Sequence, residues 1–173
     1  NMKKFFTLAS LLVLASLILT ACGGGGAKAD NLLDGIKNRG YILVSTDPNY
    51  APQSFLTTEA RATETKCPAD ALTAVEIDGF DAVVAEEIGK RLGVETCYAT
   101  PDWDVLTAGS WGDKWDMSVG SVTIKPPRPN VLYFTTPYYA PTAVIGVPTD
   151  STMTSVEELA GKAICVGTAT TYV

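Results

Sequence analysis

Residues 116–139 read DMSVGSVTIKPPRPNVLYFTTPYY, and this stretch decides how the whole chain is interpreted. A short apolar strand is followed by a turn rich in Ser, Thr and Gly, and then by Arg128. Ser121 and Thr123 offer hydroxyls and backbone N–H groups, and Gly120 permits close approach of the main chain. A guanidinium can bind both oxygens of one carboxylate with a full charge. The pattern therefore predicts a turn that holds a carboxylate.

Helical and extended patterns alternate along the rest of the chain. Helices are expected over residues 30–39, 80–92 and 102–108, with a further helix beginning at the capping box 155–158. Strands are expected over residues 41–46, 75–77, 95–99, 143–147 and 162–166, and a polar surface insertion over 57–73. In the helix over 80–92, the apolar residues Phe80, Val83, Val84, Ile88 and Leu92 recur with a helical period.

This order predicts an α/β domain with a largely parallel sheet. Ligands of such sheets bind beyond the carboxyl ends of the strands. Residues 47–52, 120–128 and 167–172 each follow an expected strand, so they are the candidate binding segments.

Composition excludes several kinds of site. The chain has no histidine, so no His-containing nucleophile pair and no His-ligated metal can form within its 173 residues. Its four cysteines include no C-x-x-C pair, which excludes the usual zinc and thioredoxin patterns. No metal and no cofactor are expected. Capping and solvated charge explain the pairs Asp102/Asp104 and Glu86/Glu87 more simply than acid–base catalysis does.

The N-terminal residues predict export. Two lysines precede an apolar run over 5–21 that is short for a membrane span, so residues 1–21 read as a signal peptide. The run ends in LTAC, which resembles the lipobox of bacterial lipoproteins, where Cys22 would be acylated. The alternative is an ordinary secretory signal with a chance cysteine. The glycine-rich residues 22–29 would form a flexible tether.

Net charge argues against one class of partner. Residues 1–21 contain two lysines and no acids, so the remaining chain has 11 basic and 19 acidic residues and a net charge of −8. Such a surface disfavours binding to nucleic acid.

Export also makes a disulfide plausible. Cys67 and Cys97 flank one helical segment and are the favoured pair; the alternative is that both remain thiols together with Cys165.

Six motifs in order, from residue 30 to 173, resemble the bacterial extracellular solute-binding proteins of family 3. They are GYILVSTDPNYAP, GFDAVVAEEIGKRLG, PDWDVLTAG, WDMSVGSVTIKPPR, YFTTPYY and VEELAGKAICVGTATT. The resemblance implies a periplasmic-binding-protein-like type II fold with two lobes, lobe 1 over 30–142 and an incomplete lobe 2 begun over 143–173. It also implies a monomeric, non-enzymatic carrier anchored by lipid at the cell envelope. Such a carrier delivers an amino acid, here expected to be polar or charged, to an ABC transporter permease.

The resemblance also assigns roles within the site. It makes Arg128 the clamp for the ligand's α-carboxylate and places Asp47 and Tyr50 on the ligand as an acid and an aromatic wall. Thr170 and Thr171 match a segment that grips the carboxylate a second time from a helix N-terminus. The alternatives are a surface arginine for Arg128 and a structural turn for Asp47.

This chain departs from the family pattern at several positions. The family's Thr-x-Thr-Pro-Glu-Arg is Thr-Ile-Lys-Pro-Pro-Arg here, which introduces Lys125 and Pro127. Gln53 replaces a frequent Phe, and Phe55 is a candidate substitute for the aromatic floor. Trp103 is expected to pack rather than to stack on a ligand. The acid that binds the ligand's ammonium is expected beyond residue 173.

A rival reading places an enzyme or a sensor domain on the same scaffold. Cyclohexadienyl dehydratases and receptor input domains resemble this family, and fold alone does not settle function. Asp47 is the acid–base candidate that such an enzyme would use.

Overall fold

The computed structural model describes residues 31–172. The expected signal peptide, the tether and Cys22 lie outside the described residues. The chain divides into two compact units, Asn1–Gly40 and Tyr41–Val173. None of the described helices is long and apolar enough to span a bilayer.

The described part of the first unit is helix α2, Leu32–Arg39. Asn31 caps it, because its side-chain oxygen accepts a hydrogen bond from the N–H of Asp34 at 3.0 Å. Asp30, where the sequence predicts this helix to begin, lies outside the described residues. The helix ends at Gly40, whose φ of 80° is the left-handed conformation that glycine adopts readily.

The second unit is built around a four-stranded sheet with the strand order β4–β6–β1–β7. Its strands are β1 (Tyr41–Ser45), β4 (Leu72–Thr73), β6 (Glu95–Ala99) and β7 (Met117–Ser118). β1 runs parallel to β6 and to β7, whereas β4 is antiparallel to β6. The carboxyl ends of three strands therefore meet at one edge, as the predicted parallel α/β sheet requires.

Helix α3 (Phe80–Leu92) packs against β6 through small residues. The hydroxyl of Tyr98 donates to the Ala82 carbonyl at 2.8 Å, and a Cβ on Gly89 would lie only 2.1 Å from Oγ1 of Thr96. The buried residues of the helix are Asp81, Ala82, Ala85 and Gly89. Phe80 and Val83, which belong to the apolar stripe read from the sequence, are 45% and 57% exposed. The helix is thus where it was expected, but close packing places its small face on the sheet.

A smaller antiparallel sheet has the strand order β2–β3–β5, with β2 at Asn49–Tyr50, β3 at Ser54–Leu56 and β5 at Ile77–Asp78. The single strand expected over 75–77 is wrong. A 3-10 turn, η1 (Ala74–Glu76), separates β4 from β5. The Glu76 carboxylate accepts hydrogen bonds from both N–H and Oγ1 of Thr73 and so stabilises this turn against an extended conformation.

The insertion over 57–73 is tied to the main sheet. Cys67 and Cys97 form a disulfide, and both are buried. Arg61 crosses the insertion and donates to the carbonyls of Cys67 at 2.9 Å and Pro68 at 2.8 Å. The insertion is therefore partly buried rather than a purely surface loop.

Helix α4 (Trp103–Ala108) follows β6, with Asp102 at its N-cap position, and ends at Gly109. Beyond β7 the chain forms two 3-10 turns, η2 (Arg128–Asn130) and η3 (Val156–Leu159).

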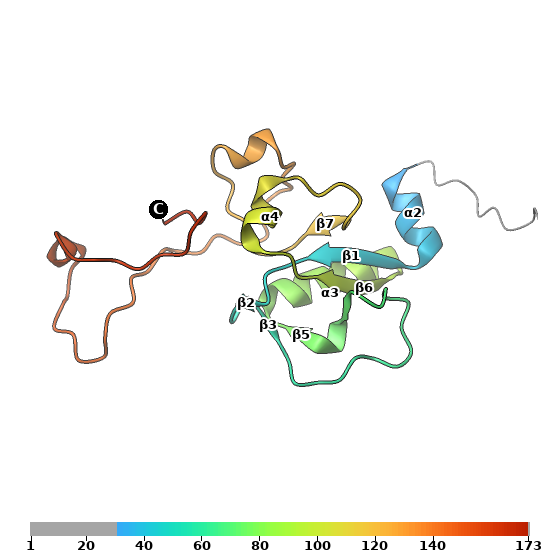
Figure 1. Cartoon of the computed structure of the whole chain (residues 1–173), viewed down its shortest axis with the longest axis horizontal. Coiled ribbons are helices and arrows are strands. Elements are labelled where there is room, and N and C mark those ends of the chain that lie inside the picture. Colours follow the sequence, from blue (N-terminus) through green and yellow to red (C-terminus); the bar gives the residue numbers. More distant parts are fainter. Residues whose placement is uncertain (1–30, 173) are drawn as a thin grey trace, which may run out of the picture. The chain divides into compact units, whose positions relative to one another are not determined.

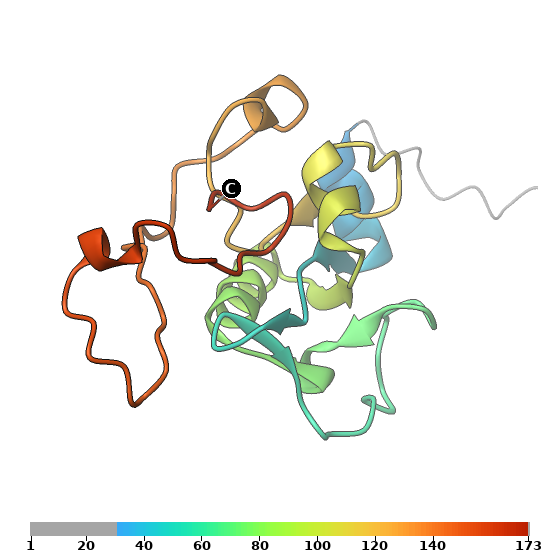
Figure 2. The ribbon, with the colours of Figure 1, turned by 60° about the vertical axis from the view of Figure 1, so that its left-hand side comes forward.

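The strands expected over 143–147 and 162–166 do not form, and the helix expected from 155 is only η3. Figure 1 and Figure 2 show residues 143–166 as a loop without strands that contains η3, and further turns lie at residues 149–150 and 160–161. Val144 is 86% exposed, and no neighbouring strand among the described residues pairs with this segment. A strand needs partners for its N–H and C=O groups, which the local apolar pattern cannot supply.

Candidate functional site

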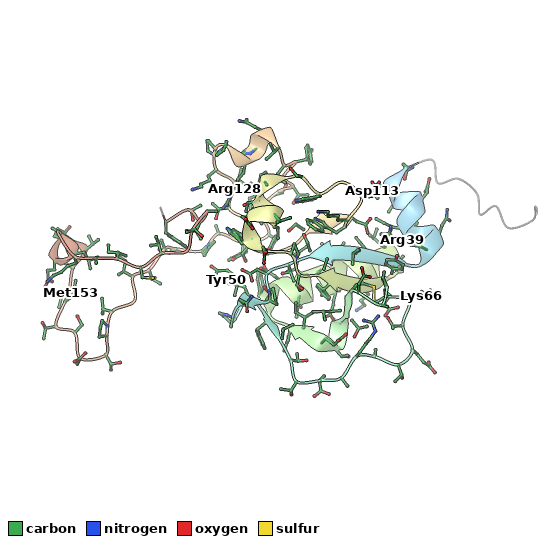
Figure 3. All side chains as sticks on the ribbon, viewed as in Figure 1. Arg39, Tyr50, Lys66, Asp113, Arg128 and Met153 are labelled. Atoms are coloured by element: carbon green, nitrogen blue, oxygen red, sulfur yellow. A yellow bond between two sulfur atoms is a disulfide. The ribbon has the colours of Figure 1, made fainter. Side chains whose placement is uncertain are left out.

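A pocket of about 270 Å³ opens beyond the carboxyl ends of β1 and β7. It is lined by Asp47, Tyr50, Trp103, Ser121, Thr123, Arg128, Gly167, Thr168, Thr170, Thr171 and Tyr172. All the ligand-binding residues predicted from the sequence line it, except Gly120. Segments that are far apart in the sequence therefore converge at the sheet edge where an α/β fold binds its ligand. Figure 3 labels Arg128 and Tyr50, which reach it from different segments.

Arg128 is the buried cation of this pocket. It begins η2 and is 5% exposed. Nη1 donates to the Thr123 carbonyl at 3.0 Å, and Nη2 donates to the Ala169 carbonyl at 2.7 Å. Burial lowers the pKa of the guanidinium from its ordinary value, although arginine in a protein remains charged. One arm of the guanidinium is thus fixed within its own turn, and the other binds an oxygen at the pocket.

Trp103 supports this guanidinium, a role that the sequence did not suggest. The centre of its ring lies 5.4 Å from Cζ of Arg128, and its Nε1 donates to the same Ala169 carbonyl at 3.2 Å. The expectation that Trp103 does not stack on a ligand stays a prediction, and Trp103 both packs on Arg128 and lines the pocket. Its position shortly after the carboxyl end of β6 could have indicated this, since all the binding segments follow strand ends.

The turn after β7 is held by a hydrogen-bond network centred on Ser121, whose φ is 55°. Its hydroxyl donates to Oδ2 of Asp81 at 2.7 Å, and its N–H donates to the hydroxyl of Tyr138 at 3.1 Å. Tyr139 donates to Oγ of Ser121 at 2.6 Å. The hydroxyl proton of Ser121 is therefore engaged by a carboxylate within the protein rather than directed at the pocket.

Asp81 is the residue of this network that sequence reasoning missed. It is fully buried in the first turn of α3, where its N–H donates to the Gln53 carbonyl at 2.8 Å. Tyr138 donates to Oδ1 of Asp81 at 2.5 Å. Burial raises the pKa of Asp81, and the hydrogen bonds from Tyr138 and Ser121 partly oppose that rise. The same burial and the adjacent carboxylate raise the pKa of Tyr138.

Gly79 positions Asp81 next to the loop after β1. Its φ is 121°, and a Cβ there would lie 2.4 Å from the Gln53 carbonyl oxygen, so only glycine fits.

Asp47 and Tyr50 both line the pocket, and Asp47 also shapes its own turn. Oδ1 of Asp47 accepts from the N–H of Asn49 at 2.9 Å, and Ser54 donates to the Asp47 carbonyl. The pKa of Tyr50 is raised by burial and by Tyr172. Phe55, the candidate for the aromatic floor, is not among the lining residues, whereas Trp103 and Tyr172 are.

Gly120 borders a separate cavity of about 780 Å³ beside residues 131–141. A Cβ at Gly120 would meet Cα of Thr46 at 3.6 Å, an ordinary contact. Packing against Thr46 therefore does not require glycine here, and the expected close approach of the main chain at Gly120 stays a prediction.

Thr170 and Thr171 lie in a turn over residues 167–172. Oγ1 of Thr170 donates to the Gly167 carbonyl at 2.7 Å, and Nζ of Lys125 donates to the Thr170 carbonyl at 2.7 Å. Within residues 31–172, no group of three or more Cys, Asp and Glu is arranged to hold a metal ion.

Comparison with known proteins places these features in a family. The family model described as bacterial extracellular solute-binding proteins, family 3, matches residues 42–160. The L-cystine-binding protein TcyJ of Escherichia coli (strain K12) is 28% identical over 145 residues, which are 83% of this chain and 49% of that protein. The L-cystine-binding protein TcyA of Bacillus subtilis (strain 168) is 29% identical over 157 residues, 87% of this chain and 53% of that protein.

A solved structure supports the same assignment. An ancestral cyclohexadienyl dehydratase superposes with a TM-score of 0.50 and 30% identity, over 65% of this chain and 40% of that one. The chain spans about half the length of the curated relatives that it matches. The chain belongs to the bacterial extracellular solute-binding proteins of family 3 and has their α/β, type II periplasmic-binding fold.

Proposed function

We propose that this chain is the substrate-binding part of an ABC importer, that it binds an amino acid between two lobes, and that it delivers this ligand to a membrane permease. The observation that carries the proposal is Arg128, a buried guanidinium that lines a pocket of about 270 Å³. A buried arginine suits recognition of a planar carboxylate, because its donors form a rigid fork. The curated relatives named as L-cystine-binding proteins support an amino-acid ligand.

In this proposal the ligand's α-carboxylate replaces the Ala169 carbonyl on Nη2 of Arg128. The bond from Nη1 to Thr123 fixes the guanidinium before the ligand arrives, so less side-chain freedom is lost on binding. Trp103 supports the guanidinium face, and Asp47 and Tyr50 also line the pocket.

Closure of residues 167–172 over the ligand would then exclude water from the site. We propose residues 30–142 as lobe 1 and 143–173 as the crossover and the start of lobe 2. We also propose that residues 1–21 are a signal peptide, that residues 22–29 are a tether, and that Cys22 is the lipid attachment site. The carrier would then be a monomer held at the cell envelope.

A second candidate is an enzyme, which one observation favours. Asp81 is a buried carboxyl group with a raised pKa, located behind the pocket, and an ancestral dehydratase shares the fold. However, both carboxylate oxygens of Asp81 already accept hydrogen bonds from Ser121 and Tyr138, and Asp81 does not line the pocket. This arrangement suits a structural acceptor better than an acid–base catalyst.

Calorimetry on the full-length protein tests the proposal. The ligand panel contains the common α-amino acids, L-cystine, and carboxylic acids without an amino group. We expect one or a few amino acids to bind, and Arg128→Ala to weaken that binding by about 30-fold or more, since truncating one partner of a buried charge pair costs about 2 kcal/mol at least.

Arg91→Ala is the matched control, because Arg91 is exposed on α3 and pairs with Glu87. It should leave affinity unchanged. Unchanged affinity in Arg128→Ala would overturn the role given to Arg128, and turnover of a bound cyclohexadienyl acid would overturn the carrier assignment.

A further inference from the structure

Two cations of the same turn bind neighbouring carbonyl oxygens beside the pocket. Arg128 and Thr170 line the pocket, whereas Lys125 reaches it through its hydrogen bond to Thr170. Nη2 of Arg128 donates to the Ala169 carbonyl and Nζ of Lys125 donates to the Thr170 carbonyl, each at 2.7 Å. These carbonyls belong to consecutive residues of one turn, so the two cations point into the same small region. Arg128 is buried and Lys125 is half-buried.

Neither cation is neutralised by the protein part that the structure describes. Within residues 31–172, neither Arg128 nor Lys125 forms an ion pair with a carboxylate. Withdrawing two cations from water without an anion is unfavourable, and the partial charge of a carbonyl oxygen offsets that cost only in part. The two carbonyl oxygens mark where anionic oxygens would bind more strongly.

The nearby carboxylates do not fill this role. Asp47 lines the pocket but accepts from its own turn at Asn49, and Asp81 is covered by Ser121 and Tyr138. Neither carboxylate pairs with Arg128 or Lys125, so the two cations remain for anionic groups of a ligand.

We propose that Lys125 is a specificity-determining residue that binds a second carboxylate of the ligand. Arg128 takes the α-carboxylate, Lys125 takes the other, and the site prefers amino acids with two carboxylates over those with one. This inference rests on the proposed function, because it assigns a ligand class to the same pocket. Glutamate and aspartate carry the second carboxylate on a short side chain, and L-cystine carries it on a second α-carbon.

The test compares pairs of ligands that differ only in this charge. Calorimetry on the full-length protein measures glutamate against glutamine, aspartate against asparagine, and L-cystine. We expect a dicarboxylate to bind at least about tenfold tighter than its amide, as a charged hydrogen bond allows. Binding of glutamate or aspartate would identify a short acidic ligand, whereas binding of L-cystine would identify cystine.

Variants then assign the preference to Lys125. Lys125→Met keeps the length of the side chain and removes its charge, so it should weaken the dicarboxylate about tenfold or more while leaving the amide within about threefold. Lys125→Arg should retain the preference. Lys114→Met is the control, because Lys114 is exposed away from the lining residues, and it should change neither ligand.

Three results would overturn the inference. An amide that binds as well as its acid refutes it, and this comparison needs no variant, so it holds even if Lys125→Met does not fold. Equal weakening of acid and amide in Lys125→Met would mean that Lys125 only tethers residues 167–172. In both cases loss of binding in Arg128→Ala would keep the proposed function, whereas no amino-acid binding at all would end both.

Discussion

Removing the Cys67–Cys97 disulfide should destabilise the second unit by about 3–4 kcal/mol. The bridge closes a loop with a sequence separation of 30 residues. Cross-linking a loop of that size removes about 3.6 kcal/mol of conformational entropy, expressed as free energy at 25 °C, from the unfolded chain. Cys67 and Cys97 also form a small buried cluster with Ala71, and Tyr41 and Leu43 pack against this cluster. Replacing both cysteines by alanine should therefore lower stability by a large fraction of typical domain stability.

Urea unfolding of the full-length protein measures this effect. The Cys67→Ala/Cys97→Ala variant and the reduced wild type should show similarly lowered midpoints, because both lack the cross-link. Cys165→Ala is the control, since Cys165 is an exposed free cysteine outside the bridge. Limited proteolysis should also cut within residues 57–73 sooner when the bridge is absent, because only hydrogen bonds, such as those of Arg61 and those from Thr65 and Lys66 to Glu95, would then hold this part of the insertion.

The reasoning fails if reduction leaves the urea midpoint unchanged under conditions in which free-thiol titration shows that both cysteines have been released. It also fails if Cys165→Ala lowers the midpoint as much as loss of the bridge does.

Two further predictions concern α3 and its contacts. Because burial raises the pKa of Asp81, the folded protein retains a proton that the unfolded chain releases, so the stability contributed by this group falls as pH rises above about 4, the unfolded value. Urea midpoints between pH 3.5 and 7 should fall for wild type relative to Asp81→Asn, and parallel profiles would contradict this. Gly89→Ala should cost about 1–3 kcal/mol, because its Cβ would meet Oγ1 of Thr96 at 2.1 Å and the Val94 carbonyl at 3.2 Å. Thermal melts should show partial recovery when Thr96→Ala is added, and no recovery would mean that the clash lies elsewhere.

Local signals were sufficient for the elements nearest the site. The bounds of α3 and β6 agree with the sequence, because the helical period stops at Gly93, a glycine with a φ of 73°, and the short strand ETCYA follows. The binding segments could likewise be predicted, since the polar residues that follow β1 and β7 necessarily meet at one sheet edge.

Tertiary contacts account for what the sequence did not predict. Asp81 lies in the first turn of α3, where the helix dipole alone is enough to explain an acidic residue. Its hydrogen bonds to Ser121 and Tyr138 connect residues that are 40 and 57 positions away in the sequence, so local pattern could not predict them. The apolar stripe of α3 predicted the wrong contact face, because close approach to β6 selects Gly89 and its small neighbours. Residues 143–147 failed as a strand because pairing, rather than local pattern, makes a strand.

The backbone at Ser121 restricts which amino acids the binding turn can tolerate. A φ of 55° is reached at little cost by glycine and with modest cost by asparagine and aspartate, but β-branched residues are strongly disfavoured there. Glycine would also lose the hydroxyl that joins Asp81 to Tyr139. Backbone conformation and hydrogen bonding together therefore permit few substitutions at Ser121. Evolutionary changes in ligand preference would arise more readily by substitution of Lys125 or Asp47.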